Sequence, residues 1–348
     1  MTDTMLAGRL DLETLDFAVE EVPIPEPAPD EVLLAVRAAG VCLSDVHLID
    51  GTLRLPPTGK LTLGHEVAGV VAKLGNAVPS SITVGQRVTL LAGQSCGTCA
   101  NCQLRKQPCL ARMTRGVHYD GGWAQYTRAR IDTLVPIPDD LPFDQAAIIP
   151  DAVSTPYAAI VATAQVRVAQ SAGVWGVGGL GAHGVQLLRL VGAAPIIAVD
   201  PLPAARERAI AFGADLALDP TAPEFADQVL AATNGRGLEH AFDFAGVQAV
   251  REQADAVLAP GGALVLVGLT PEPLTINRIV PFSTTQHRLL GHYGYQPQHV
   301  AELVSLTGHH RLDLTKSISG HIPLADAAEA VRQLTEKVNN PIRLILTP

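Results

Sequence analysis

The chain has 348 residues, of which 47% are hydrophobic and 17% charged, so it is long enough for two globular domains and too apolar for a disordered protein. Its net charge of −9 disfavours a general nucleic-acid binder. Apolar runs are broken well before the roughly 20 residues that a membrane span needs, and the N-terminal Met-Thr-Asp-Thr-Met has no signal-peptide pattern. We therefore expect a cytoplasmic protein without nucleic-acid or membrane partners, in which clustered cysteines indicate a metal.

The first half of the chain is predicted to be rich in β-structure. Short runs of β-branched and apolar residues are separated by Gly, Pro and Asp, and lie at 31–36, 67–71 and 86–91. The Pro-rich segment 23–30 is stiff and extended, which is typical of a loop or an edge strand. This half is expected to form a barrel-like module that carries the metal sites.

Two short segments of this half supply the ligand types of a catalytic zinc. Cys42 opens the segment Cys-Leu-Ser-Asp-Val-His, and Gly-His65-Glu66 follows some twenty residues later. A thiolate, an imidazole and a carboxylate with one open position suit a zinc ion that acts on a substrate. A lone Cys or His is more often a packed core residue, but the two segments together favour a metal.

The other four cysteines are clustered. Two successive C-x-x-C steps join Cys96, Cys99 and Cys102, and Cys109 follows after six residues. Four thiolates around one ion make a closed structural zinc site with no position left for chemistry. The alternative is a set of buried or oxidised thiols, which the spacing and the expected reducing compartment disfavour.

The second half begins with a dinucleotide-binding pattern. An apolar strand at 172–177 is followed by a glycine turn and by a helix whose apolar positions lie on one face. The turn contains Gly176, Gly178, Gly179 and Gly181, which permit the tight bend, close approach to a pyrophosphate and close helix packing. The helix N-terminus would then face the phosphates.

A second strand, 195–200, ends on Asp200. A carboxylate there accepts hydrogen bonds from the ribose hydroxyls and repels a 2′-phosphate, so NAD is favoured over NADP, although Arg206 lies nearby. Helices and strands continue to alternate downstream, which predicts a Rossmann-type doubly wound parallel sheet. Gly246 and Gly268 follow later strands of that sheet and are either cofactor contacts or ordinary strand-to-loop glycines.

Taken together, these motifs resemble the zinc-dependent alcohol dehydrogenases of the medium-chain dehydrogenase/reductase superfamily over essentially the whole chain. The most specific match is Gly64-His-Glu-x-x-Gly69-x5-Gly75-x-x-Val78. The resemblance implies an α/β protein with a β-rich GroES-like catalytic domain at 1–155, a Rossmann NAD-binding domain at 156–290 and a return to the catalytic domain at 291–348. It also implies an active site in the cleft between the domains and a homodimer or homotetramer.

The resemblance also implies roles for residues that no local pattern identifies. Asp151 would be the third ligand of the catalytic zinc beside Cys42 and His65, and Glu66 would bind it transiently. Thr155 would contact the nicotinamide ring, and Arg343 would contact the pyrophosphate.

The expected reaction transfers hydride from a zinc-bound alkoxide to NAD. Ser44 would take the alcohol proton and pass it through the cofactor ribose to His47, while Asp45 would orient His65. The alternative for Ser44 and His47 is a turn hydroxyl and a surface imidazole. The remaining histidines have no ligand spacing and are expected to be structural or on the surface.

Three departures from the family pattern are visible. Leu43 replaces a basic residue that some members place near the phosphates, the spacing from Cys102 to Cys109 is one residue short, and Gln86 and Gln125 replace acidic residues. The short spacing makes the structural zinc site the less secure of the two.

Ala92 and Trp123 indicate an apolar pocket for a secondary or aromatic alcohol or the corresponding ketone. The alternatives are a sorbitol- or threonine-type polyol or amino-alcohol dehydrogenase, and a zinc- and NAD-binding relative without turnover. A zinc-free quinone-reductase relative is disfavoured because such enzymes lack the ligand cysteines.

Overall fold

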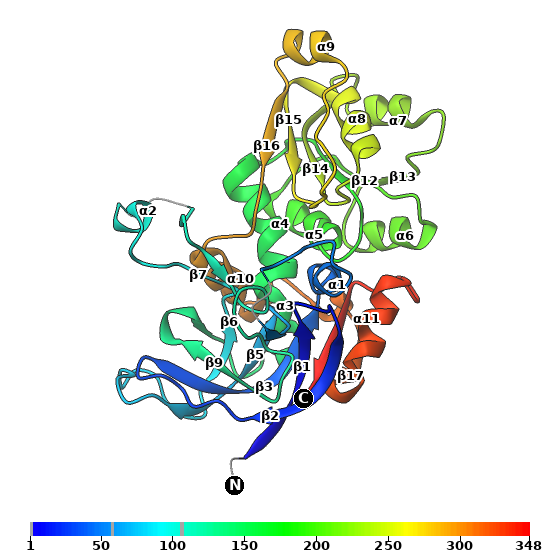
Figure 1. Ribbon diagram of the computed structural model, residues 1–348. Coiled ribbons are helices and arrows are strands. Elements are labelled where there is room, and N and C mark those ends of the chain that lie inside the picture. The colour runs from blue at the N-terminus through cyan, green and yellow to red at the C-terminus, as the bar shows by residue number, and fades with distance from the viewer. Residues whose placement is uncertain (1–2, 57–58, 105–107) are drawn as a thin grey trace. The chain divides into compact units, whose positions relative to one another are not determined.

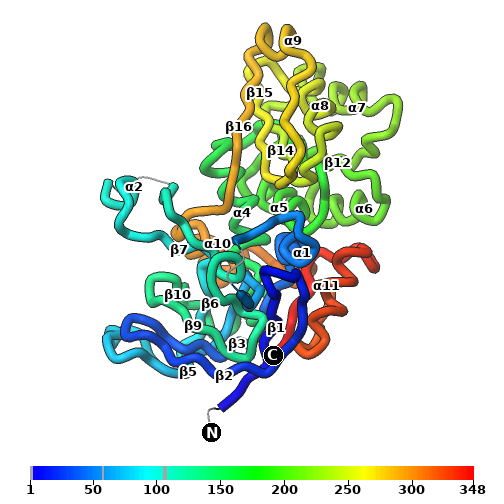
Figure 2. The backbone as a smooth tube through the Cα atoms, in the orientation of Figure 1, coloured from blue at the N-terminus to red at the C-terminus, as the bar shows by residue number. Residues whose placement is uncertain are grey.

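The computed structural model describes residues 3–56, 59–104 and 108–348, and the chain forms two compact units. Unit 1 comprises Met1–Asp151 and Val300–Pro348, and unit 2 comprises Ala152–His299. Figure 2 follows the chain from one unit to the other and back. The predicted catalytic and cofactor domains divide the chain after 155 and after 290, four and nine residues from these limits. Their assignment as domains stays a prediction.

Unit 1 is built on a mixed sheet with the strand order β10-β6-β5-β3-β18-β17, in which β9 also pairs with β3 (Figure 1). Its strands are β3 (Glu31–Val41), β5 (Val67–Leu74), β6 (Arg87–Leu90), β9 (Tyr126–Arg130), β10 (Leu134–Pro136), β17 (Ile318–Pro323) and β18 (Arg343–Thr347). A smaller sheet has the order β2-β1-β4, from β1 (Thr4–Asp11), β2 (Phe17–Pro23) and β4 (Lys60–Thr62). The short strands β7 (Gly93–Gln94) and β8 (Met113–Thr114) form an antiparallel two-stranded sheet. The three predicted strands of this half are confirmed as β3, β5 and β6.

Helices of unit 1 are short. They are α1 (Leu43–Ile49), α2 (Ala100–Gln103), α3 (Phe143–Ile148) and α11 (Ala327–Thr335), while α10 (Pro297–Gly308) begins at the end of unit 2. The core of the unit gathers apolar side chains from both sheets, among them Leu34, Val67, Leu90 and Leu346. Alternation along β3 and β5 delivers these side chains to one face, because successive residues of a strand point to opposite sides.

Trp123 belongs to this core, so the expectation that it lines the substrate pocket is wrong. Its side chain is fully buried, its indole N–H donates to the Gly40 carbonyl at 3.1 Å, and its ring meets Phe17 edge-on. Gly64 makes room for the indole, because a Cβ there would lie 2.2 Å from Trp123 Cδ1. A large ring with one N–H donor is stable in a core when that donor is satisfied.

Unit 2 is a six-stranded parallel sheet with the order β13-β12-β11-β14-β15-β16. The strands are β11 (Ala172–Trp175), β12 (Ile196–Val199), β13 (Leu216–Leu218), β14 (Leu238–Asp243), β15 (Leu258–Leu266) and β16 (Arg288–Gly291). Helices α5 (Gly181–Val191), α6 (Pro203–Ala211), α7 (Phe225–Ala232), α8 (Gln248–Ala256) and α9 (Ile279–Thr284) connect them (Figure 1). The predicted doubly wound Rossmann sheet is confirmed.

One continuous helical stretch, Phe143–Ala164, alternates between α- and π-geometry: α3 is followed by η2 (Ile149–Val153), α4 (Ser154–Ala158) and η3 (Ala159–Ala164). Pro150 and Pro156 have no N–H to donate within the helix, which explains the irregular turns around them. In the described part of the chain this stretch alone is long and apolar enough to cross a membrane. Yet 72% of its most apolar window is buried inside the protein, as in an ordinary core helix.

The buried His240 on β14 is expected to make the stability of the protein depend on pH. Burial lowers the pKa of His240 to about 4, so the folded chain keeps it neutral where the unfolded chain binds a proton, from pH 6.5 downward. We expect the melting temperature to fall as the pH falls from 6.5 towards 4, and to fall less in a His240→Gln variant. Thermal unfolding at pH 7 and pH 5 measures this. His309→Gln, at an exposed position, is the control, and an equal loss in all three proteins would contradict the assignment.

Candidate metal and cofactor sites

Strand pairing brings the candidate zinc ligands together. Strands β3 and β5 are antiparallel with Ala39 opposite Val67, so Cys42 just after β3 lies near His65 just before β5. The pairing continues beyond the strand ends, where the Gly40 N–H donates to the Glu66 carbonyl at 2.9 Å. Asp151 reaches the same place from η2.

Thr89 supports the helix that carries Asp151. Pro150 leaves the carbonyl of Ala146 without its usual helical donor, and the buried hydroxyl of Thr89 on β6 donates to that carbonyl at 2.9 Å. The π-turn at Asp151 is thereby tied to the sheet that carries the other two ligands.

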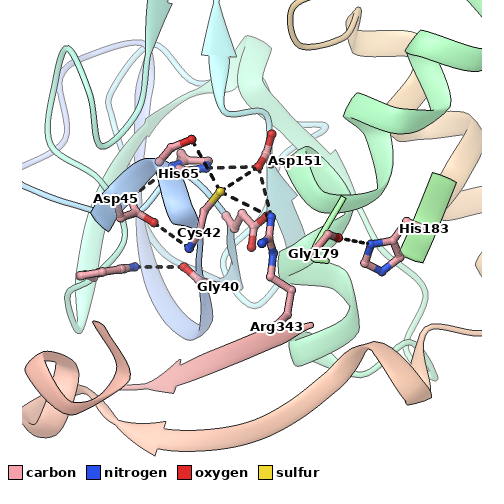
Figure 3. A network of polar contacts seen from close by, with 11 residues as sticks. Gly40, Cys42, Asp45, His65, Asp151, Gly179, His183 and Arg343 are labelled. Atoms are coloured by element: carbon pink, nitrogen blue, oxygen red, sulfur yellow. Dashed lines mark hydrogen bonds and ion pairs between the residues drawn. The ribbon is translucent and has the colours of Figure 1, made fainter. Parts of the chain in front are cut away.

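The three donor atoms have the spacing of a metal site. Asp151 Oδ2 lies 3.4 Å from Cys42 Sγ and 3.4 Å from His65 Nε2 (Figure 3). Ligands at 2.0–2.3 Å on a tetrahedral zinc stand about 3.3–3.8 Å apart, so this donor set fits the ion. Three protein ligands also leave one coordination position open, as catalytic zinc requires.

Asp45 orients the imidazole of His65. Its Oδ1 lies 3.3 Å from His65 Nδ1, on the ring side away from Asp151, and its Oδ2 accepts from the Cys42 N–H at 2.9 Å. Burial alone would lower the pKa of His65, but the carboxylates of Asp45 and Asp151 outweigh it and raise that pKa well above the usual value. A carboxylate behind a ligating histidine fixes the ring and its tautomer, as the sequence predicted for Asp45.

Arg343 is the buried cation of this cluster. Strand β18 pairs with β3 so that Leu344 faces Val41, which sets Arg343 beside Cys42. Its Nη2 lies 2.9 Å from Glu66 Oε1, 3.4 Å from Asp151 Oδ2 and 3.5 Å from Cys42 Sγ (Figure 3). All the interactions of Arg343 named here are with anionic groups of unit 1, and its predicted contact with a pyrophosphate stays a prediction.

Glu66 is enclosed between Arg343 and Gly40. Burial raises the pKa of Glu66 to about 7 although Arg343 opposes that shift. A Cβ at Gly40 would lie 1.9 Å from Glu66 Oε2, so only glycine leaves room for this carboxylate. No sequence signal identified Gly40, because its neighbour in space is 26 residues away in the chain.

Ser44 and His47 lie on α1, whose N-cap is Cys42. They are three residues apart and therefore share a helix face. Ser44 Oγ is 3.7 Å from Cys42 Sγ. The side chains of Ser44 and His47 are both half-buried. Leu43 is exposed.

The four clustered cysteines also converge. Their sulfur atoms all lie within 4.8 Å of one another, with Cys96 3.6 Å from Cys109 and Cys99 3.9 Å from Cys109. Tetrahedral thiolates at 2.3 Å from zinc are about 3.8 Å apart, so the geometry fits a closed site. Residues 105–107, in the shortened spacing before Cys109, lie outside the described residues.

Backbone donors favour the thiolate in this cluster. The N–H groups of Thr98 and Cys99 lower the pKa of Cys96 to about 6, whereas the neighbouring Cys99 thiol raises that of Cys102 to about 12. Thiols that share protons in this way release them when a cation binds.

The glycine turn of unit 2 has the shape that the sequence predicted. Gly176 has φ +85°, and a Cβ at Gly181 would lie 1.8 Å from the Gly176 carbonyl oxygen, so helix α5 packs closely on the turn. A Cβ at Gly178 would meet nothing within 4 Å, which leaves its backbone open to a ligand. The side chain of His183 hydrogen-bonds the Gly179 carbonyl at 2.7 Å (Figure 3).

Asp200 follows β12 and faces the same turn. Its Oδ2 accepts from the Val177 N–H at 2.8 Å, and its Oδ1 accepts from the Leu202 N–H at 2.9 Å. Arg206 pairs with Asp219 at 3.1 Å and also donates to the Asp200 carbonyl, so its charge is already balanced.

Gly246 and Gly268 pack against each other. A Cβ at Gly268 would lie 2.4 Å from Gly246 N, and both backbones bond to Asp243, which ends β14. Close backbone contact by itself accounts for glycine at both positions, and their role as cofactor contacts stays a prediction. Asp243 also forms a buried ion pair with Arg251 at 2.9 Å, which the sequence did not predict.

Thr155 lies on α4 and is nearly buried. Its carbonyl is 3.0 Å from His292 Nε2. Its predicted contact with the nicotinamide remains untested.

Comparisons with known proteins agree with this geometry. Residues 28–139 match the family description "Alcohol dehydrogenase GroES-like domain" and residues 179–308 match "Zinc-binding dehydrogenase". The alcohol dehydrogenase of Geobacillus stearothermophilus is 35% identical over 74% of this chain and 76% of its own. The chain belongs to the zinc-dependent medium-chain alcohol dehydrogenase family.

Two more relatives span the whole fold. The L-threonine 3-dehydrogenase of Thermococcus kodakarensis is 29% identical over 90% of each chain. The structure of a zinc-binding dehydrogenase from Sinorhizobium meliloti 1021 bound to NADP is 28% identical, with a TM-score of 0.91 and full coverage of both chains. The predicted fold, the enzyme class and the use of zinc with a nicotinamide cofactor by this dehydrogenase are confirmed.

Proposed function

We propose that this dehydrogenase oxidises an alcohol to a ketone or aldehyde, and runs the reverse reduction, with Cys42, His65 and Asp151 as ligands of the catalytic zinc. The observation that carries the proposal is the convergence of these three donors. Asp151 Oδ2 lies 3.4 Å from both Cys42 Sγ and His65 Nε2, and all three atoms lie within 4.8 Å of one another. Zinc at these ligands supplies a Lewis acid that lowers the pKa of a bound hydroxyl, and the nicotinamide supplies the hydride acceptor.

The protein's own groups handle the proton. Ser44 Oγ accepts the proton of the substrate hydroxyl while its own hydroxyl proton is passed on towards His47, which lies on the same face of α1 and releases a proton to water. Asp45 holds His65 in the tautomer whose Nε2 is free to bind the ion. Glu66 is held by Arg343 beside the ligands and takes a transient part in ligand exchange.

In the same proposal, the four clustered cysteines bind a structural zinc ion and unit 2 binds the cofactor. Gly176 to Gly181, Thr155, Gly246 and Gly268 contact the dinucleotide, while Arg343 is a candidate phosphate contact. The proposal also includes a homodimer or homotetramer in the cytoplasm.

We further propose NAD rather than NADP as the cofactor, because the Asp200 carboxylate lies beside the glycine turn and repels a 2′-phosphate. Replacing Asp200 with Gly should raise the ratio of kcat/KM for NADP to that for NAD by about ten- to a hundredfold, since a like-charge repulsion is removed. Initial rates with both cofactors measure the ratio. Asp215→Asn, at the amino ends of β12 and β13, is the control. An unchanged ratio in Asp200→Gly would show that another group selects the cofactor.

The substrate is proposed only as an alcohol or its carbonyl product, because burial of Trp123 removes the main argument for an aromatic pocket. A second candidate is an amino-alcohol dehydrogenase, which the relative from Thermococcus kodakarensis favours by its coverage of 90% of both chains. Both candidates share the metal and cofactor sites.

A combined assay tests the proposal. Zinc is measured in the purified protein, and reduction of NAD and NADP is followed with primary, secondary and aromatic alcohols, polyols and L-threonine. We expect two zinc ions per chain and turnover of one substrate class, abolished by a chelator and restored by zinc. Zinc-loaded protein that binds NADH but turns over no substrate would instead support a binding relative without activity.

A further inference from the structure

His292 stands at the end of the parallel sheet where ligands bind in folds of this type. It follows β16 directly, and its backbone N–H donates to the Leu266 carbonyl at the end of β15 at 3.0 Å. Both strands are parallel to their neighbours, so His292 lies at the carboxyl edge of the sheet. The family pattern gives this histidine no role, and the sequence predicted only a structural or surface residue.

Both ring nitrogens of His292 form hydrogen bonds with the helical stretch that contains Thr155. Nε2 lies 3.0 Å from the carbonyl oxygen of Thr155 on α4, and Nδ1 lies 2.9 Å from the hydroxyl of Thr163 on η3. A carbonyl only accepts, so Nε2 must carry the hydrogen, and Nδ1 then accepts from the Thr163 hydroxyl. The neutral ring therefore ties the end of β16 to two positions eight residues apart on this helical stretch.

The surroundings keep the ring in that neutral form. Burial lowers the pKa of His292 to about 4, and the nearby His299 opposes protonation as well. His299 packs on Tyr157 of the same helix α4, edge-on with ring centres 5.7 Å apart. The helix is irregular here, because Pro156 cannot donate and π-turns flank α4, so a fixed partner for the Thr155 carbonyl defines where this turn lies.

We propose that His292 is a positioning residue for the nicotinamide half of the cofactor site, acting through the backbone of Thr155. The inference rests on the proposed function, in which Thr155 contacts the nicotinamide ring. His292 itself touches no reacting atom in this proposal. It fixes the position of Thr155. It therefore affects how tightly the nicotinamide ring binds, but not how tightly the adenosine half of the cofactor binds.

Binding of two probes separates this role from a general effect on folding. NADH reports the whole site, whereas ADP-ribose lacks the nicotinamide and reports the adenosine and pyrophosphate half alone. In His292→Ala we expect the Kd for NADH to rise about tenfold, as the loss of one to two buried hydrogen bonds implies, while the Kd for ADP-ribose changes less than about twofold. His292→Gln offers a donor and an acceptor and should recover most of the NADH affinity.

Two further variants complete the experiment. Thr163→Val keeps the shape of its side chain but removes the hydroxyl that fixes the ring, and should shift NADH affinity in the same direction by a smaller factor. His240→Gln is a matched buried histidine at the opposite end of the sheet, bonded to Gln170, and should leave both affinities unchanged. Thr163→Val also keeps the test informative if His292→Ala does not fold.

The outcomes distinguish the inference from the function beneath it. Equal weakening of NADH and ADP-ribose in His292→Ala, or unchanged NADH affinity in both His292→Ala and Thr163→Val, would overturn the positioning role alone. A wild-type protein that binds neither NADH nor NADPH would overturn the proposed function and the inference together.

Discussion

Replacing Cys42 with Ala is expected to lower kcat/KM for alcohol oxidation by a factor of about 10³ or more, because loss of the metal forfeits several kcal/mol of transition-state stabilisation. Cys42 Sγ is one of three donors, beside Asp151 Oδ2 and His65 Nε2, and two remaining ligands hold zinc weakly. The variant should therefore contain one zinc ion per chain where the wild type contains two. Metal analysis and initial rates on the same preparation measure both effects.

Cys109→Ala is the matched control for this experiment. It removes one thiolate from the other cysteine cluster, so it should lower the zinc content equally and the melting temperature more, while the remaining enzyme keeps most of its kcat. Full NAD reduction by Cys42→Ala, or the same loss of kcat in both variants, would contradict the assignment of the two sites.

Replacing Arg343 with Met should lower the free energy of unfolding by about 3–5 kcal/mol, since it leaves buried carboxylates without their cation. The guanidinium is 3% exposed and lies 2.9 Å from the fully buried Glu66. Met keeps much of the apolar volume of the arginine side chain. The loss of stability therefore measures the effect of removing the charge rather than the effect of creating a cavity. Urea unfolding of metal-free protein followed by circular dichroism measures the change without a contribution from zinc.

Two comparisons identify the origin of that loss. The double variant Arg343→Met/Glu66→Gln removes both charges and should recover more than half of the lost stability. Arg332→Met removes an arginine that pairs with Glu329 and Glu336 on the solvent-exposed side of α11, and should cost much less stability than Arg343→Met. Similar losses in Arg343→Met and Arg332→Met would mean that the buried cluster contributes no more than a surface ion pair.

Local patterns were sufficient to predict unit 2. The turn from Gly176 to Gly181 and the strand that precedes Asp200 are each marked by local residue patterns and lie within about 25 residues of each other in the chain. Regular alternation of strands and helices then leaves one common topology. The same reasoning failed for β16, whose short sequence Arg288–Gly291 contains no alternation to mark it. His292, which follows it, was consequently read as structural.

In unit 1, local patterns predicted the strands β3, β5 and β6, but site residues only where ligand chemistry marks them. Spacing identified the four clustered cysteines, and residue type identified Cys42 and His65. The position of Arg343 depends on the pairing of β18 with β3, whose paired residues are just over 300 positions apart, and no local signal encodes such pairing. Trp123 was misassigned for the same reason, because its neighbours Gly40 and Phe17 come from distant parts of the chain.

The pairing of β18 with β3 has a consequence for biosynthesis. Unit 2 is one uninterrupted segment, Ala152–His299, and its contacts are available as soon as that segment has left the ribosome. The sheet that carries Cys42 has to wait for residues 343–347. Until then residues 39–41 of β3 lack their partner strand, while residues 31–35 of the same edge can already pair with β9. A nascent chain is therefore expected to fold unit 2 before the unit 1 sheet is complete. Because Cys42, His65 and Asp151 all precede Ala152, the buried cation Arg343 is the member of their cluster that arrives last, and the chain should be most prone to aggregation in the interval before β18 pairs.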